Sequence, residues 1–330
     1  MKNLNTTIII SVIILSIAGC NSKNENYTYI NTTTNSTLHE YIIKELPENI
    51  MYPGEILISE DKLVIIQHKT DSIFYIFDVE NLEYQYSFGN YGSGPNEFLQ
   101  INTDNIIKKK NGFKVYCIDN SILDVDINKR KIINKEQFIS DYDLFNGFEQ
   151  LNDSLYAFTN MQDKEYQFVT YNAKNGSITP IIKYPKWIED GYNERDLISK
   201  IIKYNGHLIS NNDGSKIAMF YGYINCMRLF NSNGDTYKTC ILGKERNPYL
   251  HDIVYYPIRP QNTEEYIYSV YRGDTGKDVL QKWSWTGELI KSYKLDYKIS
   301  SFCISDDGKK IYAIIYSDDD ICKLVIYNIE

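Results

Sequence analysis

Residues 305–313 read Ser-Asp-Asp-Gly-Lys-Lys-Ile-Tyr-Ala, a tight turn that leads directly into a strand. The pair Asp307 and Gly308 supplies the positive φ that a short hairpin turn requires. Residues 210–218 repeat the arrangement as Ser-Asn-Asn-Asp-Gly-Ser-Lys-Ile-Ala, with the pair at Asp213 and Gly214. We predict that both segments connect the first and second strands of a sheet, and that their role is structural.

Strand-like runs of the same kind fill the chain from residue 38 to residue 330. Runs of four to eight residues rich in Ile, Val, Tyr and Phe are separated by Gly, Asn and Asp. They fall into groups of four with a repeat of roughly 48 residues, which is close to the period of four-stranded propeller blades. The sixth group, residues 301–328, has only three runs, and the spare run at 38–43 would complete it.

This grouping predicts an all-β domain over residues 38–330. The expected architecture is a six-bladed β-propeller with four-stranded blades, whose ring closes when the N-terminal strand pairs with the C-terminal blade. Closure of this kind leaves only short, protected sheet edges. A β-sandwich, or a pair of them, is the alternative that periodicity alone leaves open.

A glycine-rich connection lies between the first and second groups. Residues 88–98 read Phe-Gly-Asn-Tyr-Gly-Ser-Gly-Pro-Asn-Glu-Phe. The glycines permit backbone angles closed to other residues, the proline fixes one dihedral, and the final phenylalanine is placed to fill the space between neighbouring blades. We expect a structural connection, with a ligand or partner loop as the alternative; the residues concerned are Gly92, Gly94, Pro95, Asn96, Glu97 and Phe98.

Both motifs resemble those of a known family. The Ser-x-Asp-Gly-x-Lys-Ile pattern is similar to the repeat of TolB-type propellers, and the connection is similar to that of NHL-type repeats. The Gly-x-Gly-Pro-x-Glu-Phe element more closely resembles that of the TolB-like, six-bladed propeller lipoproteins of Bacteroidota. The resemblance implies the same propeller fold on an envelope lipoprotein.

The amino terminus has the features of an export signal. Lys2 precedes an apolar run at residues 8–17, which is too short to span a bilayer, and Ala18, Gly19 and Cys20 follow. This ending resembles a lipobox, so we predict a signal peptide at residues 1–19 and lipidation of Cys20. An ordinary secretory signal with an incidental cysteine is the alternative.

Residues 20–37 are rich in Asn, Ser and Thr, which predicts a flexible tether to the membrane. By resemblance to enteric lipoproteins, Asn21 in place of aspartate points to the outer membrane of the cell envelope; the membrane face stays open.

Composition and motifs exclude several classes of function. The net charge of −8 argues against a nucleic-acid partner. Neither Gly-x-Ser-x-Gly nor His-Glu-x-x-His occurs, so no catalytic residue is predicted. The four histidines share no ligand spacing, and the five cysteines beyond Cys20 form no Cys-x-x-Cys pair, so we expect no metal and no cofactor. A disulfide between Cys226 and Cys240 is a minority alternative to buried, reduced cysteines.

The sequence therefore favours a non-enzymatic binding or interaction module for an unidentified protein, peptide or glycan. Aromatic residues in predicted loops are candidate contacts: Trp187, Tyr192, Tyr249, Tyr255 and Tyr256. One alternative is a metal-dependent lactonase or lyase using residues expected around the central channel: Asp104, Asn105, Glu149, Asn205 and Asp252. Another is a structural subunit of an envelope complex.

Overall fold

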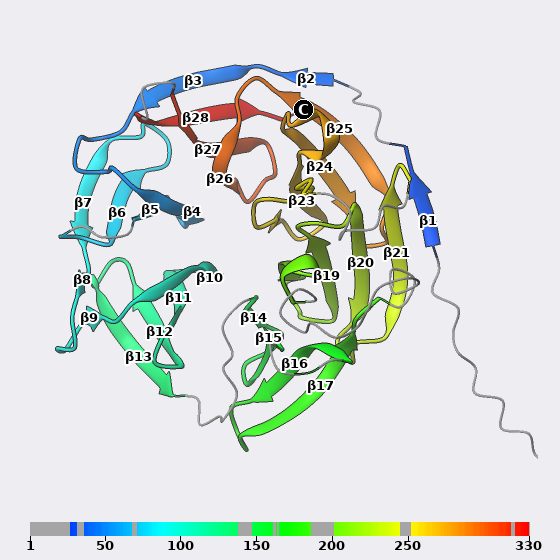
Figure 1. Ribbon diagram of the computed structural model, residues 1–330. Coiled ribbons are helices and arrows are strands. Elements are labelled where there is room, and N and C mark those ends of the chain that lie inside the picture. The colour runs from blue at the N-terminus through cyan, green and yellow to red at the C-terminus, as the bar shows by residue number, and fades with distance from the viewer. Residues whose placement is uncertain are drawn as a thin grey trace, which may run out of the picture.

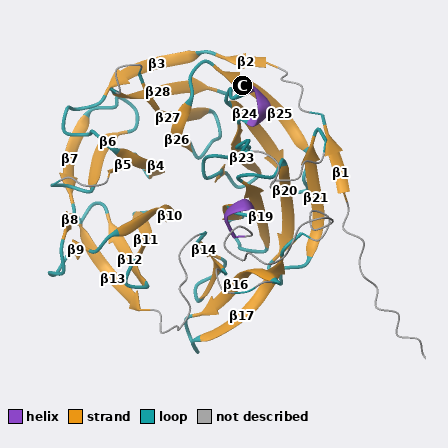
Figure 2. Cartoon of the chain, in the orientation of Figure 1, coloured by secondary structure: helices purple, strands orange, loops and turns teal. Residues whose placement is uncertain are grey.

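A ring of small β-sheets surrounds a central axis in the computed structural model (Figures 1 and 2). The structure describes residues 27–31, 36–67, 71–137, 147–160, 163, 165–185, 201–244, 252–317 and 321–329, with the side chains of residues 41, 104 and 105 excepted. Six of its sheets are blades of four or five strands. Across these described ranges, no helix has both the length and the apolar character needed to cross a membrane.

The blades follow one another in chain order, each running from an inner to an outer strand. Blades 1 and 2 consist of β4 (Pro53–Ser59), β5 (Lys62–Gln67), β6 (Phe74–Asp78) and β7 (Tyr84–Phe88), and of β10 (Ile101–Lys109), β11 (Gly112–Cys117), β12 (Ser121–Asp126) and β13 (Lys131–Gln137). Blade 3 consists of β14 (Glu149–Gln150), β15 (Leu155–Thr159), β16 (Tyr166–Asn172) and β17 (Ser177–Lys183).

The second half of the ring repeats this plan. Blade 4 contains β18 (Gly206–Ser210), β19 (Lys216–Tyr221), β20 (Cys226–Asn231) and β21 (Thr236–Leu242), and blade 5 contains β22 (Gln261–Asn262), β23 (Tyr266–Tyr271), β24 (Val279–Ser284) and β25 (Leu289–Leu295). Blade 6 takes β26 (Ile299–Ile304), β27 (Lys310–Tyr316) and β28 (Cys322–Asn328) from the end of the chain.

The ring closes as the sequence predicts. Strand β3 (Glu40–Glu45) pairs antiparallel with β28, with Ile43 opposite Val325, and is the outer strand of blade 6. The predicted closing run at 38–43 is displaced by two residues, because Leu38 belongs to the preceding strand and packs between blades 5 and 6. The six-bladed, all-β architecture is confirmed.

The segment before β3 differs from the predicted flexible tether. Strand β1 (Tyr27–Ile30) pairs parallel with β21, and β2 (Ser36–Leu38) pairs parallel with β25, so each adds a fifth strand to a blade. The prediction of a tether over 20–37 is therefore wrong for these two strands. Without β1 and β2, the outer strands β21 and β25 of blades 4 and 5 would have one edge whose backbone N–H and C=O groups lack a partner. Hydrogen bonds from these groups to β1 and β2 order the two short strands, although these strands have little apolar surface. We call residues 27–31 and 36–45 the strap.

The inner strand of blade 5 also differs from expectation. It is the two-residue β22, whereas Tyr255 and Tyr256 of the preceding connection are each only 1% exposed and pack between blades 4 and 5. These two tyrosines are therefore core residues and not ligand contacts. The other predicted aromatic contacts, Trp187, Tyr192 and Tyr249, lie outside the described residues, as does Cys20.

The apolar core is divided into six clusters, one between each pair of neighbouring blades. Cys226 lies in the cluster between blades 3 and 4, and Cys240 in the cluster between blades 4 and 5. Cys226 is opposite Ile241 and Cys240 is opposite Met227, so the two sulfur atoms point to opposite faces of the sheet. The alternative of a disulfide between them is wrong, and both cysteines are free and buried.

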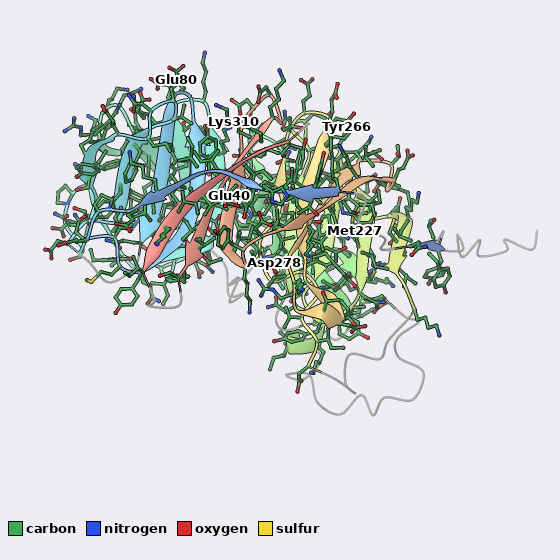
Figure 3. All side chains as sticks on the ribbon, turned by 90° about the horizontal axis from the view of Figure 1, so that it is seen from above. Glu40, Glu80, Met227, Tyr266, Asp278 and Lys310 are labelled. Carbon is green, nitrogen blue, oxygen red and sulfur yellow. The ribbon has the colours of Figure 1, made fainter. Side chains whose placement is uncertain are left out.

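The ring has two different faces. Turns between the first and second strands, and between the third and fourth, lie on what we call the turn face; Glu80 and Lys310 mark it in the edge-on view of Figure 3. The connections between blades lie on the opposite side, the connection face, toward which Asp278 is placed. The inner strands run between the two faces and surround the axis.

Candidate functional site

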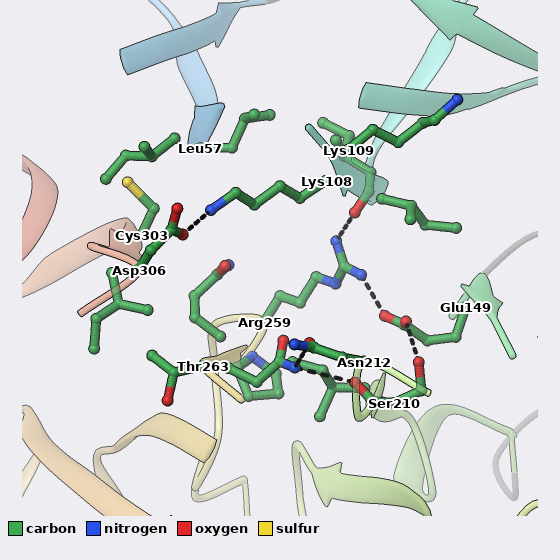
Figure 4. A pocket seen from close by; sticks show the side chains of 18 of the residues that line it. Leu57, Lys108, Lys109, Glu149, Ser210, Asn212, Arg259, Thr263, Cys303 and Asp306 are labelled. Carbon is green, nitrogen blue, oxygen red and sulfur yellow. Dashed lines mark hydrogen bonds and ion pairs between the residues drawn. The ribbon is translucent and has the colours of Figure 1, made fainter. Parts of the chain in front are cut away.

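The described residues form a large cavity at the mouth of the axial channel on the turn face (Figure 4). It has a volume of about 730 Å³, and all six blades contribute to its wall. Inner strands β4, β10, β14, β18, β22 and β26 end there, which is why short turns of every blade meet at one place. A concave polar site of this size is suited to a small ligand or to a segment of a larger one.

The floor of this cavity is a buried ion pair. Arg259, from the connection before blade 5, reaches the Glu149 carboxylate of blade 3 and donates to the carbonyl oxygen of Ile106 in blade 2. The side chains of Arg259 and Glu149 are 12% and 7% exposed. Ser210 of blade 4 donates from Oγ to the other Glu149 oxygen at 3.2 Å. Four blades are thus linked across the axis.

Arg259 also separates two spaces. It lines the mouth cavity and a smaller cavity of about 160 Å³, whose other lining residues include Phe148, Asn205 and His207. The smaller cavity lies toward the connection face, because its lining residues come at or before the starts of β14 and β18. Because one side chain borders both spaces, the guanidinium and its partners form a partition within the channel.

The Glu149 carboxyl experiences two opposing effects. Burial raises its pKa above the usual value, while the Arg259 guanidinium and the Ser210 hydroxyl act in the opposite direction. Burial is the larger effect, because a carboxylate loses most of its hydration at this position. Replacing Arg259 by a neutral residue would therefore leave a carboxyl group that readily takes up a proton.

The wall of the mouth has two chemically different halves. Blades 3 to 5 present the exposed carboxylate of Glu264 and, mainly, amides and hydroxyls: Gln150, Ser210, Asn212, Gln261, Asn262 and Thr263. Asn262 Nδ2 lies 3.3 Å from the carbonyl oxygen of Ser210 and 3.4 Å from Asn212 Oδ1, which holds two blades together at the rim. Blades 6, 1 and 2 present charged groups, among them an ion pair between Lys108 and Asp306 that spans the end of blade 1.

The three predicted channel residues whose side chains the structure describes lie in different places. Among those with described side chains, Glu149 lies at the floor of the mouth and Asn205 lines the smaller cavity. Asp252 has a side chain that is 95% exposed and an ion pair with Lys203 at 3.0 Å. Asp104 and Asn105 have backbones in β10, but their side chains lie outside the described part of the chain.

The glycine-rich connection folds onto itself at the outside of the ring (Figure 1). Glu97 accepts a hydrogen bond from the Gly94 N–H at 2.7 Å, and a Cβ on Gly92 would approach the Glu97 carboxylate to 2.0 Å. Strands β8 (Asn90–Tyr91) and β9 (Glu97–Phe98) form a short parallel pair. Asn96, at a φ of 64°, accepts from the Ile132 N–H of blade 2.

Phe98 ends this connection and is 1% exposed between blades 1 and 2, where its ring packs edge-on against Phe74. Pro95 lies within the same connection. Residues 92–98 are absent from the walls of both channel cavities, and these contacts favour a structural role. A ligand role for the connection stays a prediction.

The structure places both Asp-Gly pairs in turns between the first two strands of their blades. Asp213 accepts from the Ser215 N–H at 2.9 Å, and Asp307 accepts from the Lys309 N–H at 3.0 Å. Gly214 has a φ of 66°, and a Cβ there would approach the Leu151 carbonyl oxygen of blade 3 to 1.6 Å. The glycine is therefore needed both for the turn and for close contact with the neighbouring blade.

Sequence reasoning missed Arg259 and a second group of polar residues. Arg259 lies in a connection without a recognisable motif, so no local signal indicated it. The second group is His39, Glu40 and Asp296, whose potential ligand atoms all lie within 4.8 Å of one another. Their separation in the sequence hides this proximity.

Comparison with known proteins identifies the family to which this fold belongs. The family model for TolB-like six-bladed propellers matches residues 29–307. No curated protein matches this chain. A crystal structure of a protein described as exported, from Bacteroides fragilis, is similar with a TM-score of 0.58 and 11% identity, covering 92% of this chain and 99% of that one. A member of the DUF4221 family from Bacteroides vulgatus has a TM-score of 0.56 and 12% identity, covering 90% and 99%.

The two solved structures share the fold at an identity too low to carry function. The family match extends over most of the chain, from the strap to the first turn of blade 6, and it agrees with the six blades and their closure. This chain belongs to the TolB-like six-bladed propeller family.

Proposed function

We propose that the protein is an exported lipoprotein, anchored through Cys20, whose propeller binds a polar peptide or glycan at the mouth of its channel without catalysing a reaction. The mouth cavity is the observation that carries the proposal, because all six blades contribute to a polar wall of about 730 Å³. The similar Bacteroides fragilis protein, described as exported, supports the location.

The amide half of the wall suits a ligand with many hydroxyl or amide groups. Amide side chains both donate and accept hydrogen bonds, so Asn212 and Gln261 can match a peptide backbone or sugar hydroxyls equally well. The opposite half contains charges of both signs, several of them already paired. Such a wall favours neutral or zwitterionic ligands over strongly charged ones.

A binding role agrees with the hydrogen bonding of Glu149 at the floor of the mouth cavity. Both Glu149 oxygens are engaged, one by Arg259 and the other by Ser210. The described members of the proposed catalytic set, Glu149, Asn205 and Asp252, lie in different places. These observations supply no converging carboxylates for the lactonase or lyase alternative.

Ligand capture from cell-envelope extract tests the proposal. The bait is the chain with Cys20→Ser, which removes the lipid and keeps the propeller. We expect a specific peptide or glycan to be retained, and retention to fall at least about tenfold in Asn212→Ala/Gln261→Ala, the loss of roughly 1.4 kcal/mol of binding free energy.

The matched control is Asn233→Ala/Gln85→Ala, which removes two exposed amides away from the cavity. Equal retention by the wild type and Asn212→Ala/Gln261→Ala would contradict binding at the mouth. Turnover of the retained molecule would contradict the non-enzymatic role.

The anchor has a separate test. We propose that Cys20 is lipidated and that Asn21 directs the protein to the outer membrane. Metabolic labelling with a fatty acid should mark the wild type and not Cys20→Ser, and fractionation should find the wild type with outer-membrane markers. Labelling that persists in Cys20→Ser would contradict the assignment of the lipid to this residue.

A further inference from the structure

Three side chains with metal-ligating atoms meet where the strap passes from blade 5 to blade 6. His39 lies between β2 and β3, Glu40 begins β3, and Asp296 directly follows β25. His39 Nδ1 lies 3.0 Å from Asp296 Oδ2, and one oxygen of Glu40 lies within 4.8 Å of both. Glu40 is on the rim of the ring, away from the channel mouth (Figure 3).

The donor set suits a divalent transition metal. One imidazole nitrogen and two carboxylate oxygens match the ligands of Zn²⁺ sites that keep an open position for water, whereas Mg²⁺ and Ca²⁺ prefer oxygen alone. Ligands about 2.1 Å from Zn²⁺ in a tetrahedron are roughly 3.4 Å apart. The separations in the structure, 3.0 Å between His39 and Asp296 and at most 4.8 Å within the group, are near that spacing, and the His39 side chain is 78% exposed and so free to adjust.

Tyr327 supplies a second observation at the same place. It stands opposite Glu40 in the pairing of β28 with β3, and it is fully buried. Its hydroxyl is buried in the apolar cluster between blades 5 and 6. It lies beside the backbone N–H of Tyr297 but forms no hydrogen bond of normal geometry within the described structure.

We propose that His39, Glu40 and Asp296 bind a divalent transition-metal ion that clamps the strap to the connection between blades 5 and 6. The ion would join the amino-terminal part of the chain to a segment more than 250 residues later, at the closure of the ring.

Binding at this place must couple to folding. The ligands come together only in the closed ring, so the ion binds the folded chain and not the unfolded one. Its presence therefore raises the free energy of unfolding by RT ln(1 + c/Kd), where c is the ion concentration, and this term grows with the logarithm of c once c exceeds Kd. A simple ion pair between His39 and Asp296 gives no such dependence on metal.

Titration of metal-free protein with Zn²⁺ tests the proposal. The full mature chain is used without a polyhistidine tag, because the tag would itself bind the metal. Calorimetry should give one Zn²⁺ per chain, thermal unfolding should shift upward by a few degrees, and Co²⁺ should give visible absorption bands of a site with nitrogen and oxygen ligands.

The variants His39→Gln and Asp296→Asn should weaken Zn²⁺ binding at least about tenfold and abolish the metal-dependent shift. Glu45→Gln, which removes another exposed carboxylate from β3, is the matched control and should bind as the wild type does. Circular dichroism without metal shows whether each variant is folded. Absence of Zn²⁺ binding in the wild type, or equal binding in His39→Gln, would overturn the proposal.

Discussion

Arg259 occupies an unusual position for a charged residue. It comes from a connection on one side of the ring, and its guanidinium bonds to blades 2 and 3 across the axis. A buried ion pair of this kind loses hydration that its attraction only partly restores, so its presence is weak evidence for stability. Removing only one partner destabilises the fold, because the other charge is then left buried without compensation.

Replacing Arg259 alone should therefore be costly. We expect Arg259→Met to lower the free energy of unfolding by about 3–5 kcal/mol, and Arg259→Met/Glu149→Gln to lower it by much less. Urea unfolding of the wild type, both single variants and the double variant measures this. Additive losses would show that the two side chains do not act as a pair.

The decrease in the free energy of unfolding of Arg259→Met should also depend on pH. Burial already raises the pKa of Glu149, and without Arg259 it rises further. A carboxyl whose pKa is higher folded than unfolded stabilises the fold below its unfolded pKa, and this contribution disappears as the pH rises through the folded pKa. Unfolding of Arg259→Met should thus show a larger deficit at about pH 8 than at about pH 5. A deficit that shrinks as the pH rises would contradict this.

Asp307 should give stability the opposite dependence on pH. Its hydrogen bonds from Ser305 and from the Lys309 N–H hold the pKa of the carboxyl below its usual value of 3.8. Its contribution to stability is present above that value and is lost as the pH falls through the lowered pKa. We expect Asp307→Asn to reduce Tm slightly near neutral pH and not at about pH 2. Glu80→Gln, which removes another carboxylate on the turn face, is the control. A lower Tm of Asp307→Asn that persists in acid would show that the charge of Asp307 is not the cause.

Strands and their turns were the most predictable elements. Alternating apolar residues and Asp-Gly pairs are local signals, and they indicated the blades and the closing strand near residue 40. Strands β1 and β2 were not predictable, since they are ordered by the edges of β21 and β25, more than 200 residues away. Strand β22 escaped notice because two residues carry no periodicity.

The connection between blades 1 and 2 can be tested through its last residue, Phe98, and the residue that follows it, Leu99. Phe98 is 1% exposed and Leu99 is 37% exposed, although they are adjacent. We expect Phe98→Ala to lower the free energy of unfolding by about 3–5 kcal/mol, because it leaves a cavity between the blades. Leu99→Ala should change it by no more than about 0.5 kcal/mol. Similar losses in both variants would contradict the packing role of Phe98.

The assembled site was only partly predictable. Glu149 was anticipated at the channel because it begins an inner strand, yet its partners Arg259 and Ser210 come from different blades. Which side chains converge depends on the register and length of six inner strands, and a single sequence does not contain that information in any local pattern. The same applies to His39 and Asp296, which are 257 residues apart.

Closure of the ring predicts different effects for two truncations. A chain that begins at residue 39 lacks β1 and β2 but retains β3, so we expect a folded propeller with a lower Tm. A chain that begins at residue 46 also lacks β3 and exposes the edge of β28. We expect it to lose its cooperative unfolding transition and to aggregate, as measured by calorimetry and size-exclusion chromatography. Cooperative unfolding at the same Tm would show that the closing strand is dispensable.

The arrangement of the strap also constrains the order of events during synthesis. Strands β1, β2 and β3 leave the ribosome before their partners β21, β25 and β28, which are made more than 200 residues later. Until then an unfinished chain carries open edges at both ends, which invite pairing with other nascent chains. Protection against such association therefore arrives only when β28 has been made and can pair with β3.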